Sequence, residues 1–226
     1  MATNLSLSRS LVVRSTSEFV YNSVRQAILT HQFPAGSRLV EAKTSKELNV
    51  SITPVREAFA CLANQGLLTV FPYKGTYVTI ISRQYVDDVY FLRGQLEVMA
   101  AEKGFPNLTQ SDIEFYEQLS AISDVAYDEK DLYESIHCDV QFHEHMFQIS
   151  GSSLLMEMWH IIKYRIENIQ SYTKPVMNAR LSVRHKPMLE ALRARDREGY
   201  VTALVEHLNS KPRVVDFPDE KDVRYD

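Results

Sequence analysis

Glycine and proline are scarce in this chain, and long apolar runs are absent from it. Its 226 residues include only seven glycines and eight prolines, which argues against an all-β fold with many tight turns. No run of about 18 apolar residues occurs, so no membrane-spanning helix is predicted. The first stretch, MATNLSLSRSLVVRSTSEF, has too short an apolar segment for a secretion signal. We therefore expect a cytoplasmic protein without a membrane partner.

Cysteine is equally rare. Cys61 and Cys138 are the two cysteines; they make no disulfide framework, and we expect reduced thiols. Hydrophobic residues make up 45% of the chain and charged residues 24%, which are ordinary values for a globular protein. The length allows one large domain or two small ones.

Acidic residues outnumber basic ones, but the excess is unevenly distributed. The chain holds 25 Lys and Arg against 29 Asp and Glu, a net charge of −4. Residues 1–80 contain eight of the basic and four of the acidic residues, so this part is about +4 and the remainder about −8. A basic first part on an acidic body indicates that the first part faces an anionic partner.

The pattern over residues 10–80 predicts a winged helix-turn-helix. Apolar residues recur at three- and four-residue steps, which is typical of amphipathic helices. The segments LLTVF and TYVTII, joined by PYKG, indicate two strands and a tight turn. Three helices are predicted before these strands, over residues 17–31, 42–49 and 51–64.

From about residue 84 the pattern changes to long amphipathic segments. Thr109, followed three residues later by Asp112, is typical of a capping box. We expect a mainly α protein, in which an all-helical antiparallel bundle over 84–210 follows the winged helix-turn-helix and a polar, loosely held tail occupies 211–226. Six helices are predicted in the bundle, near residues 84–103, 109–123, 130–149, 153–172, 177–195 and 197–209.

The segment NVSITPVREAFACLANQGLL is typical of a recognition helix. A helix N-terminus offers unpaired N–H groups and a positive dipole end, which suit phosphate. Ser51 or Thr53 can cap the helix or donate to DNA, and Arg56 can contact a guanine or a phosphate. Each is an ordinary surface residue alone, but their order within a basic winged helix favours DNA. The candidate set is Lys43, Ser45, Lys46, Ser51, Thr53, Arg56, Tyr73, Lys74 and Gly75.

Four metal-binding side chains fall on apolar helix faces of the second part. Asp139 and His143 lie four residues apart on one face of their helix. His185 and His207 each continue the apolar face of their own helix. Burial of a carboxylate and three imidazoles without partners is costly, and one divalent cation offsets that cost for all four. The set suits Zn²⁺, Ni²⁺ or Mn²⁺, although a single such histidine would be better explained as a hydrogen-bonded core residue.

Four stretches of the first part, LTHQFPAGSRLVE, VSITPVREAF, NQGLL and KGTYV, resemble the DNA-binding domain of the GntR family of bacterial transcription regulators. The resemblance covers most of residues 17–80, with the same order and spacing. The chain differs at Ile52, where the family usually has an arginine, and at Thr44-Ser45, where it usually has Leu-Ala. One family contact to DNA is therefore missing.

The stretches DVQFHEHMFQISGS, RHKPMLEALRARD and ALVEHL resemble the FCD effector-binding domain of the FadR-type subfamily. The number of predicted helices, six, resembles the shorter, VanR-like branch of this subfamily more than the longer one. The resemblance implies an all-helical domain that senses a small carboxylate and holds a metal. The implied metal ligands are Asp139, His143, His185 and His207.

Two arginines need separate mention. FLRGQLE resembles the segment whose arginine meets the effector's carboxylate, which implies that role for Arg93. A surface or interhelical salt bridge is the alternative for this residue. Arg184 departs from the family pattern, which commonly has an acidic residue there, so the orientation of His185 is expected to differ.

These observations predict a homodimeric transcription regulator, acting as a repressor, that binds double-stranded operator DNA and responds to a small organic acid. Two alternatives stay open. A helical metal-dependent hydrolase could use the same ligands to activate water, although no general base is evident beside them and the basic first part would be unexplained. In the other alternative, the helical part only dimerises a DNA-binding protein and holds no metal.

Overall fold

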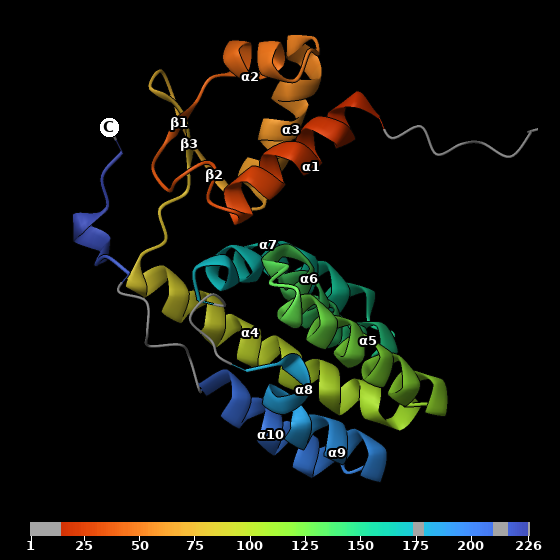
Figure 1. The fold of residues 1–226 in the computed structure, drawn as a ribbon. Coiled ribbons are helices and arrows are strands. Elements are labelled where there is room, and N and C mark those ends of the chain that lie inside the picture. Colours follow the sequence, from red (N-terminus) through yellow and green to blue (C-terminus); the bar gives the residue numbers. More distant parts are fainter. Residues whose placement is uncertain (1–14, 174–178, 210–216, 226) are drawn as a thin grey trace, which may run out of the picture.

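The computed structural model describes residues 15–173, 179–209 and 217–225. Its buried apolar side chains form two separate cores, one in the first part of the chain and one in the helical part. Figure 1 shows the first part as a small unit above a larger bundle of helices. Each unit buries its own apolar face, which is the mark of a domain.

The first unit is a three-helix arrangement with a small sheet. Its helices are α1 (Thr16–Leu29), α2 (Glu41–Glu47) and α3 (Ile52–Asn64), each within two residues of the predicted bounds. Val55, Phe59 and Leu62 of α3 are buried, as the apolar spacing predicted. The helix ends at Asn64, and Gly66 follows with a φ of +79°, a conformation that favours glycine.

The sheet has one strand more than predicted. Strands β2 (Leu68–Phe71) and β3 (Gly75–Val78) form the expected ribbon, and β1 (Arg38–Leu39) pairs with the other edge of β3. All pairs are antiparallel, with Leu39 opposite Thr76. A strand of two residues is too short to show the alternation by which strands are recognised.

The second unit consists of helices α4 to α10. Helix α4 runs through the middle of the bundle and contacts α6, α7 and α10, while α5 contacts α6, α8 and α9 (Figure 1). The capping box at Thr109 and Asp112 is present. In the described residues we find no helix with the length and apolarity needed to cross a membrane. The helices are α4 (Arg83–Gly104), α5 (Gln110–Asp128), α6 (Leu132–Ile149), α7 (Ser153–Thr173), α8 (Leu181–Arg184), α9 (Lys186–Ala194) and α10 (Arg197–Asn209), with short 3₁₀ helices at Phe105–Asn107 and Glu220–Asp222.

The single helix predicted over 177–195 is wrong. Its first residues lie outside the described ones, and the rest forms α8 and α9 with a break at His185. Pro187 stands in the first turn of α9, where its missing N–H costs least. The break turns His185 into the bundle, where it is fully buried. Helix α5 also extends beyond the predicted residue 123, to Asp128.

The two units contact each other through α1 and α7. Arg25 of α1 forms a buried ion pair with Glu167 of α7 and donates to Tyr133 Oη at 2.5 Å. His31 Nε2 lies 3.1 Å from the carbonyl oxygen of Ser171. A buried cation and a buried carboxylate are tolerated together because each neutralises the other.

The expectation of a loosely held tail is wrong for residues 217–225. Phe217 is buried, and Ser82 donates to Glu220. The hydroxyl of Tyr225 accepts from the backbone N–H of Ile80 at 3.0 Å, and its ring lies against Phe71 with centroids 4.9 Å apart. This segment therefore packs on the first unit and the start of α4 (Figure 1). The other residues of the predicted tail, 211–216 and 226, lie outside the described ones.

Candidate metal centre and DNA interface

Three of the four predicted metal ligands converge in the helical unit. His143 of α6, His185 at the α8–α9 break and His207 of α10 each offer a donor atom, and these atoms lie within 4.8 Å of one another. His143 and His185 are fully buried, and His207 is half-buried. Three imidazoles from distant segments thus share one small space.

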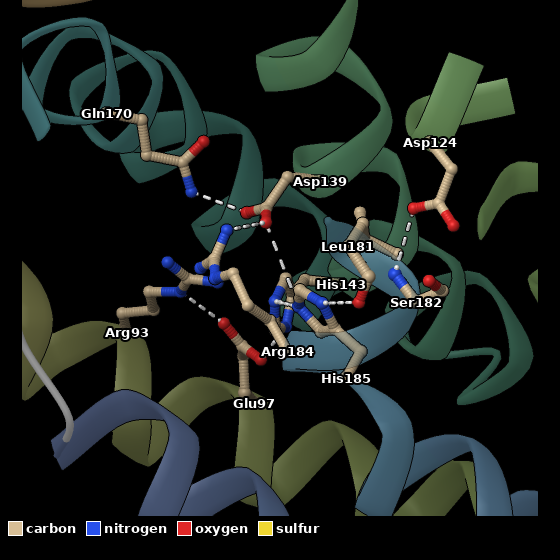
Figure 2. Close-up of polar contacts among 10 residues, drawn as sticks. All are labelled: Arg93, Glu97, Asp124, Asp139, His143, Gln170, Leu181, Ser182, Arg184 and His185. Atoms are coloured by element: carbon tan, nitrogen blue, oxygen red, sulfur yellow. Dashed lines mark hydrogen bonds and ion pairs between the residues drawn. The ribbon is translucent and has the colours of Figure 1, made fainter. Parts of the chain in front are cut away.

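Hydrogen bonds show that the Nδ1 atom carries a proton in two of these rings. His143 Nδ1 lies 2.6 Å from Glu97 Oε2, and His185 Nδ1 lies 3.1 Å from the carbonyl oxygen of Leu181 (Figure 2). Burial alone would raise the pKa of Glu97, but His143 and Arg93 outweigh it and lower that pKa to about 2. An ionised carboxylate and a carbonyl only accept, so each Nδ1 carries its proton.

The remaining nitrogens of these two rings face each other. His143 Nε2 and His185 Nε2 are 3.2 Å apart, a separation that suits two neighbouring ligands of one ion with bonds of about 2.0–2.1 Å. Burial, and then the charge of His207, hold the pKa of His185 well below its usual value, so that His185 Nε2 offers a lone pair either to a metal ion or to a proton on His143. The donor set therefore fits a divalent cation, with Glu97 and Leu181 orienting the ligands.

Asp139, the fourth predicted ligand, lies at the edge of this cluster and outside the 4.8 Å group. It is fully buried, and its Oδ1 is 3.8 Å from His185 Nε2. Gln170 Nε2 donates to its Oδ2 at 2.5 Å, and Arg184 Nη1 donates to Oδ1 at 3.2 Å (Figure 2). The carboxylate is adjacent to the candidate centre but is already hydrogen-bonded by two side chains.

Arg93 lies next to the same centre, buried in α4. Its Nε donates to Glu97 Oε1 at 2.5 Å, so the salt bridge is within one helix and not between helices or at the surface. Its Nη2 is buried and has no hydrogen-bond partner in the part of the chain that the structure describes. A buried donor without a partner costs about 1–3 kcal/mol, which an anionic ligand beside it would remove.

The predicted DNA-binding residues at the start of α3 are exposed. Ser51 precedes α3 at the cap position, but its side chain makes no capping hydrogen bond. Thr53 and Arg56 are exposed on the first turns, and Arg56 Nε donates to Glu41 Oε2 at 2.7 Å. Ile52, which stands where the family usually has arginine, is also exposed.

The residues predicted on α2 and at the strand turn are mostly exposed as well. Lys43 and Lys46 are exposed, whereas Ser45 is half-buried and donates to Ala42 O at 3.1 Å. Tyr73 and Lys74 project from the turn, and Gly75 has a φ of +128°. The turn between β2 and β3, which carries Tyr73 and Lys74, forms the wing.

Sequence reasoning missed several residues of both regions. Arg38 is exposed on β1, and a Cβ at Gly75 would lie 2.8 Å from its Nε, so it adds a cation to the wing. Glu97 and Gln170 position His143 and Asp139. In the sequence, the available signal for Arg38 was its place in the stretch RLVE at the start of α2. Glu97 gave no signal, because it resembles an ordinary helical partner of Arg93.

A winged helix-turn-helix joined to an all-helical domain defines a class of protein, the DNA-binding transcription regulators. Comparisons with known proteins agree. The model of the bacterial regulatory proteins of the gntR family matches residues 16–78, and the FCD domain model matches residues 88–210. The chain belongs to the GntR family, in its subfamily with an FCD domain.

Individual relatives support this assignment. The chain is 29% identical over 191 residues to the HTH-type transcriptional repressor RspR of Escherichia coli (strain K12), covering 84% of each chain. It is 27% identical over 191 residues to the HTH-type transcriptional regulator McbR of the same strain, covering 83% of this chain and 86% of the other. The solved structure of E. coli McbR/YncC has a TM-score of 0.71 at 25% identity, covering 85% of this chain and 93% of that one.

Another solved structure, a GntR regulator from Rhodococcus sp. RHA1, shares the fold with a TM-score of 0.73 at 20% identity, covering 85% of this chain and 93% of that one. Family and relatives are transcription regulators and not enzymes. The metal-dependent hydrolase is therefore set aside.

Proposed function

We propose that this GntR-family protein is a cytoplasmic repressor that binds operator DNA as a homodimer and senses a small carboxylate through a metal centre. The observation that carries the proposal is the convergence of His143, His185 and His207. Residues 10–80 are the proposed DNA-binding domain and residues 84–210 the effector domain. The relative RspR is a transcriptional repressor, which supports the direction of control.

In the proposed dimer, each subunit places α3 in a major groove, and the two-fold axis pairs it with a second half-site. Phosphate contacts give affinity and salt dependence, and contacts to base edges give sequence choice. Exposure of most of the candidate side chains, all except Ser45 and Gly75, supports this role. The proposed contacts are Lys43, Ser45 and Lys46 of α2, Ser51, Thr53 and Arg56 at α3, and Tyr73, Lys74 and Gly75 of the wing.

In the effector domain, the three histidines would hold the ion, with Asp139 as a further ligand. A bound Zn²⁺, Ni²⁺ or Mn²⁺ would supply a position for a carboxylate oxygen. Arg93 would bind the same anion through its unpartnered Nη2. The effector must bind one arrangement of the DNA-binding domains better than the other, because equal affinity for both shifts nothing.

The first experiment is elemental analysis of the purified protein, with mass analysis for retained organic acid. We expect about one divalent ion per subunit in the wild type and its loss in His185→Ala, which removes one of three imidazole ligands. His137→Ala is the matched control, because His137 Nε2 lies 2.8 Å from Gln141 Nε2 on α6 and outside the histidine cluster.

Two outcomes would contradict the proposal. Full occupancy in His185→Ala would remove this residue from the ligand set. A wild-type protein that binds operator DNA yet retains no metal after dialysis would favour a helical domain that only dimerises.

A further inference from the structure

Arg184, the last residue of α8, lies beside the histidine cluster. Its Nη1 donates to Asp139 Oδ1 at 3.2 Å, and its side chain is only 15% exposed. His185 Nε2 lies 3.8 Å from the same oxygen. A guanidinium therefore shares the Asp139 carboxylate with the candidate metal centre (Figure 2).

Arg93 reaches the same space from α4. Its Nε donates to Glu97 Oε1 at 2.5 Å, and the other oxygen of that carboxylate lies 2.6 Å from His143 Nδ1. One carboxylate therefore joins the guanidinium of Arg93 to a histidine of the cluster. Nη2 of Arg93 also lacks a hydrogen-bond partner among the described residues.

Among the described residues, the two arginines and two carboxylates beside the cluster balance only without an ion. Glu97 and Asp139 compensate Arg93 and Arg184 one for one. A divalent ion adds two positive charges to this buried space, and a buried charge is costly unless an opposite charge compensates it. A ligand with two negative charges cancels the two positive charges of the ion. An acidic residue in place of Arg184 would change the local charge by the same amount and would cancel them without any ligand.

We propose that the effector is a dianion of the dicarboxylate class and that Arg184 selects for its second negative charge. The inference rests on the proposed function, because it needs the metal and the carboxylate site. One carboxylate meets the ion and Arg93. The second meets Arg184, whose guanidinium has more N–H donors than the one that Asp139 accepts.

Isothermal titration calorimetry on the metal-loaded protein tests this selection. The probes are malonate, succinate and glutarate, each beside its monoamide, which is similar in size but has one negative charge fewer. We expect at least one dianion to bind about ten times more tightly than its monoamide, and Arg184→Gln to reduce that ratio to about threefold or less. Elemental analysis should find the metal content of Arg184→Gln unchanged.

Two further variants serve as controls. Arg184→Lys keeps the positive charge and should keep most of the ratio. Lys186→Gln removes an exposed charge two residues away and should leave the ratio unchanged. Equal affinity for dianion and monoamide in the wild type, or an unchanged ratio in Arg184→Gln, would overturn the inference alone. If none of the six probes binds the metal-loaded protein, or if no metal binds, both this inference and the proposed sensing of a carboxylate through a metal centre fail.

Discussion

Arg56 lies on the exposed face of α3 and is held there by Glu41. Contact with a guanine would exchange this solvent-exposed pair for a bidentate hydrogen bond to the base. We expect Arg56→Ala to weaken binding to a duplex selected with the wild-type protein by about 1–3 kcal/mol. Fluorescence anisotropy at fixed salt measures this change.

The matched control is Glu41→Gln, which frees Arg56 without removing it. We expect its DNA affinity to equal or exceed that of the wild type, since a surface ion pair contributes only about 0–1 kcal/mol. An Arg56→Ala protein with wild-type affinity would rule out a base contact by this residue.

At the scale of single residues, the sequence indicated the histidines but not their partners. Asp139 and His143 could be found because a four-residue step places both on one helix face. Glu97 and Gln170 come from other helices, 46 and 31 residues away from the residues they contact. No periodicity within one helix reports which side chain of another helix will face it.

Among the elements, α7 connects the candidate centre with the DNA-binding domain. Within five residues it supplies Gln170 to Asp139, Glu167 to Arg25, and the carbonyl oxygen of Ser171 to His31. A displacement of this turn of α7 would therefore change contacts both at the candidate metal centre and at the DNA-binding domain. The link was not predicted, because His31 has no distinctive pattern in the sequence and Arg25 lies on an ordinary amphipathic helix.

Arg25→Met tests the connection. It leaves the buried carboxylate of Glu167 without its cation, a defect that costs about 3–5 kcal/mol while the interface stays closed. We expect α1 and α7 to separate so that water reaches Glu167, and hydrogen exchange in the facing turns to increase. Metal content should stay at the wild-type level.

The double variant Arg25→Met with Glu167→Leu is the control, because it replaces both charges with apolar groups. Its hydrogen exchange should return toward the wild-type pattern. Unchanged protection of α1 in Arg25→Met would mean that other contacts hold the two units together.

The order of the elements was predictable, but some of their ends were not. Helices with a sustained apolar face were found within a few residues of their bounds, as for α6 and α7. The break at His185 was missed because the apolar face continues across it. Pro187 was the available signal, since proline in a helix interior removes a hydrogen bond.

For the molecule as a whole, the chain passes between its two units more than once. After α10 it returns, and residues 217–225 lie against the first unit and the start of α4. The polar composition of this segment predicted a loose tail. Composition does not show whether single aromatic side chains will pack against apolar residues elsewhere in the fold. Phe217 and Tyr225 fix the described part of this segment.

Tyr225 provides the last prediction. Its hydroxyl accepts from the N–H of Ile80, just after β3, and lies 3.4 Å from Thr69 Oγ1 on β2. Tyr225→Phe removes this acceptor and keeps the ring on Phe71, so the loss should be about 0.5–1.5 kcal/mol. We expect faster amide exchange at Ile80, measured by NMR, with little change in α6.

Tyr127→Phe, on α5 of the other unit, is the matched control and should leave exchange at Ile80 unchanged. Because β2 and β3 carry the wing, a looser Ile80 should also weaken DNA binding slightly, through the wing rather than through α3. If Ile80 keeps its protection in Tyr225→Phe, the C-terminal segment does not support the wing in solution. The DNA-binding domain would then depend on α1 and α7 for its position.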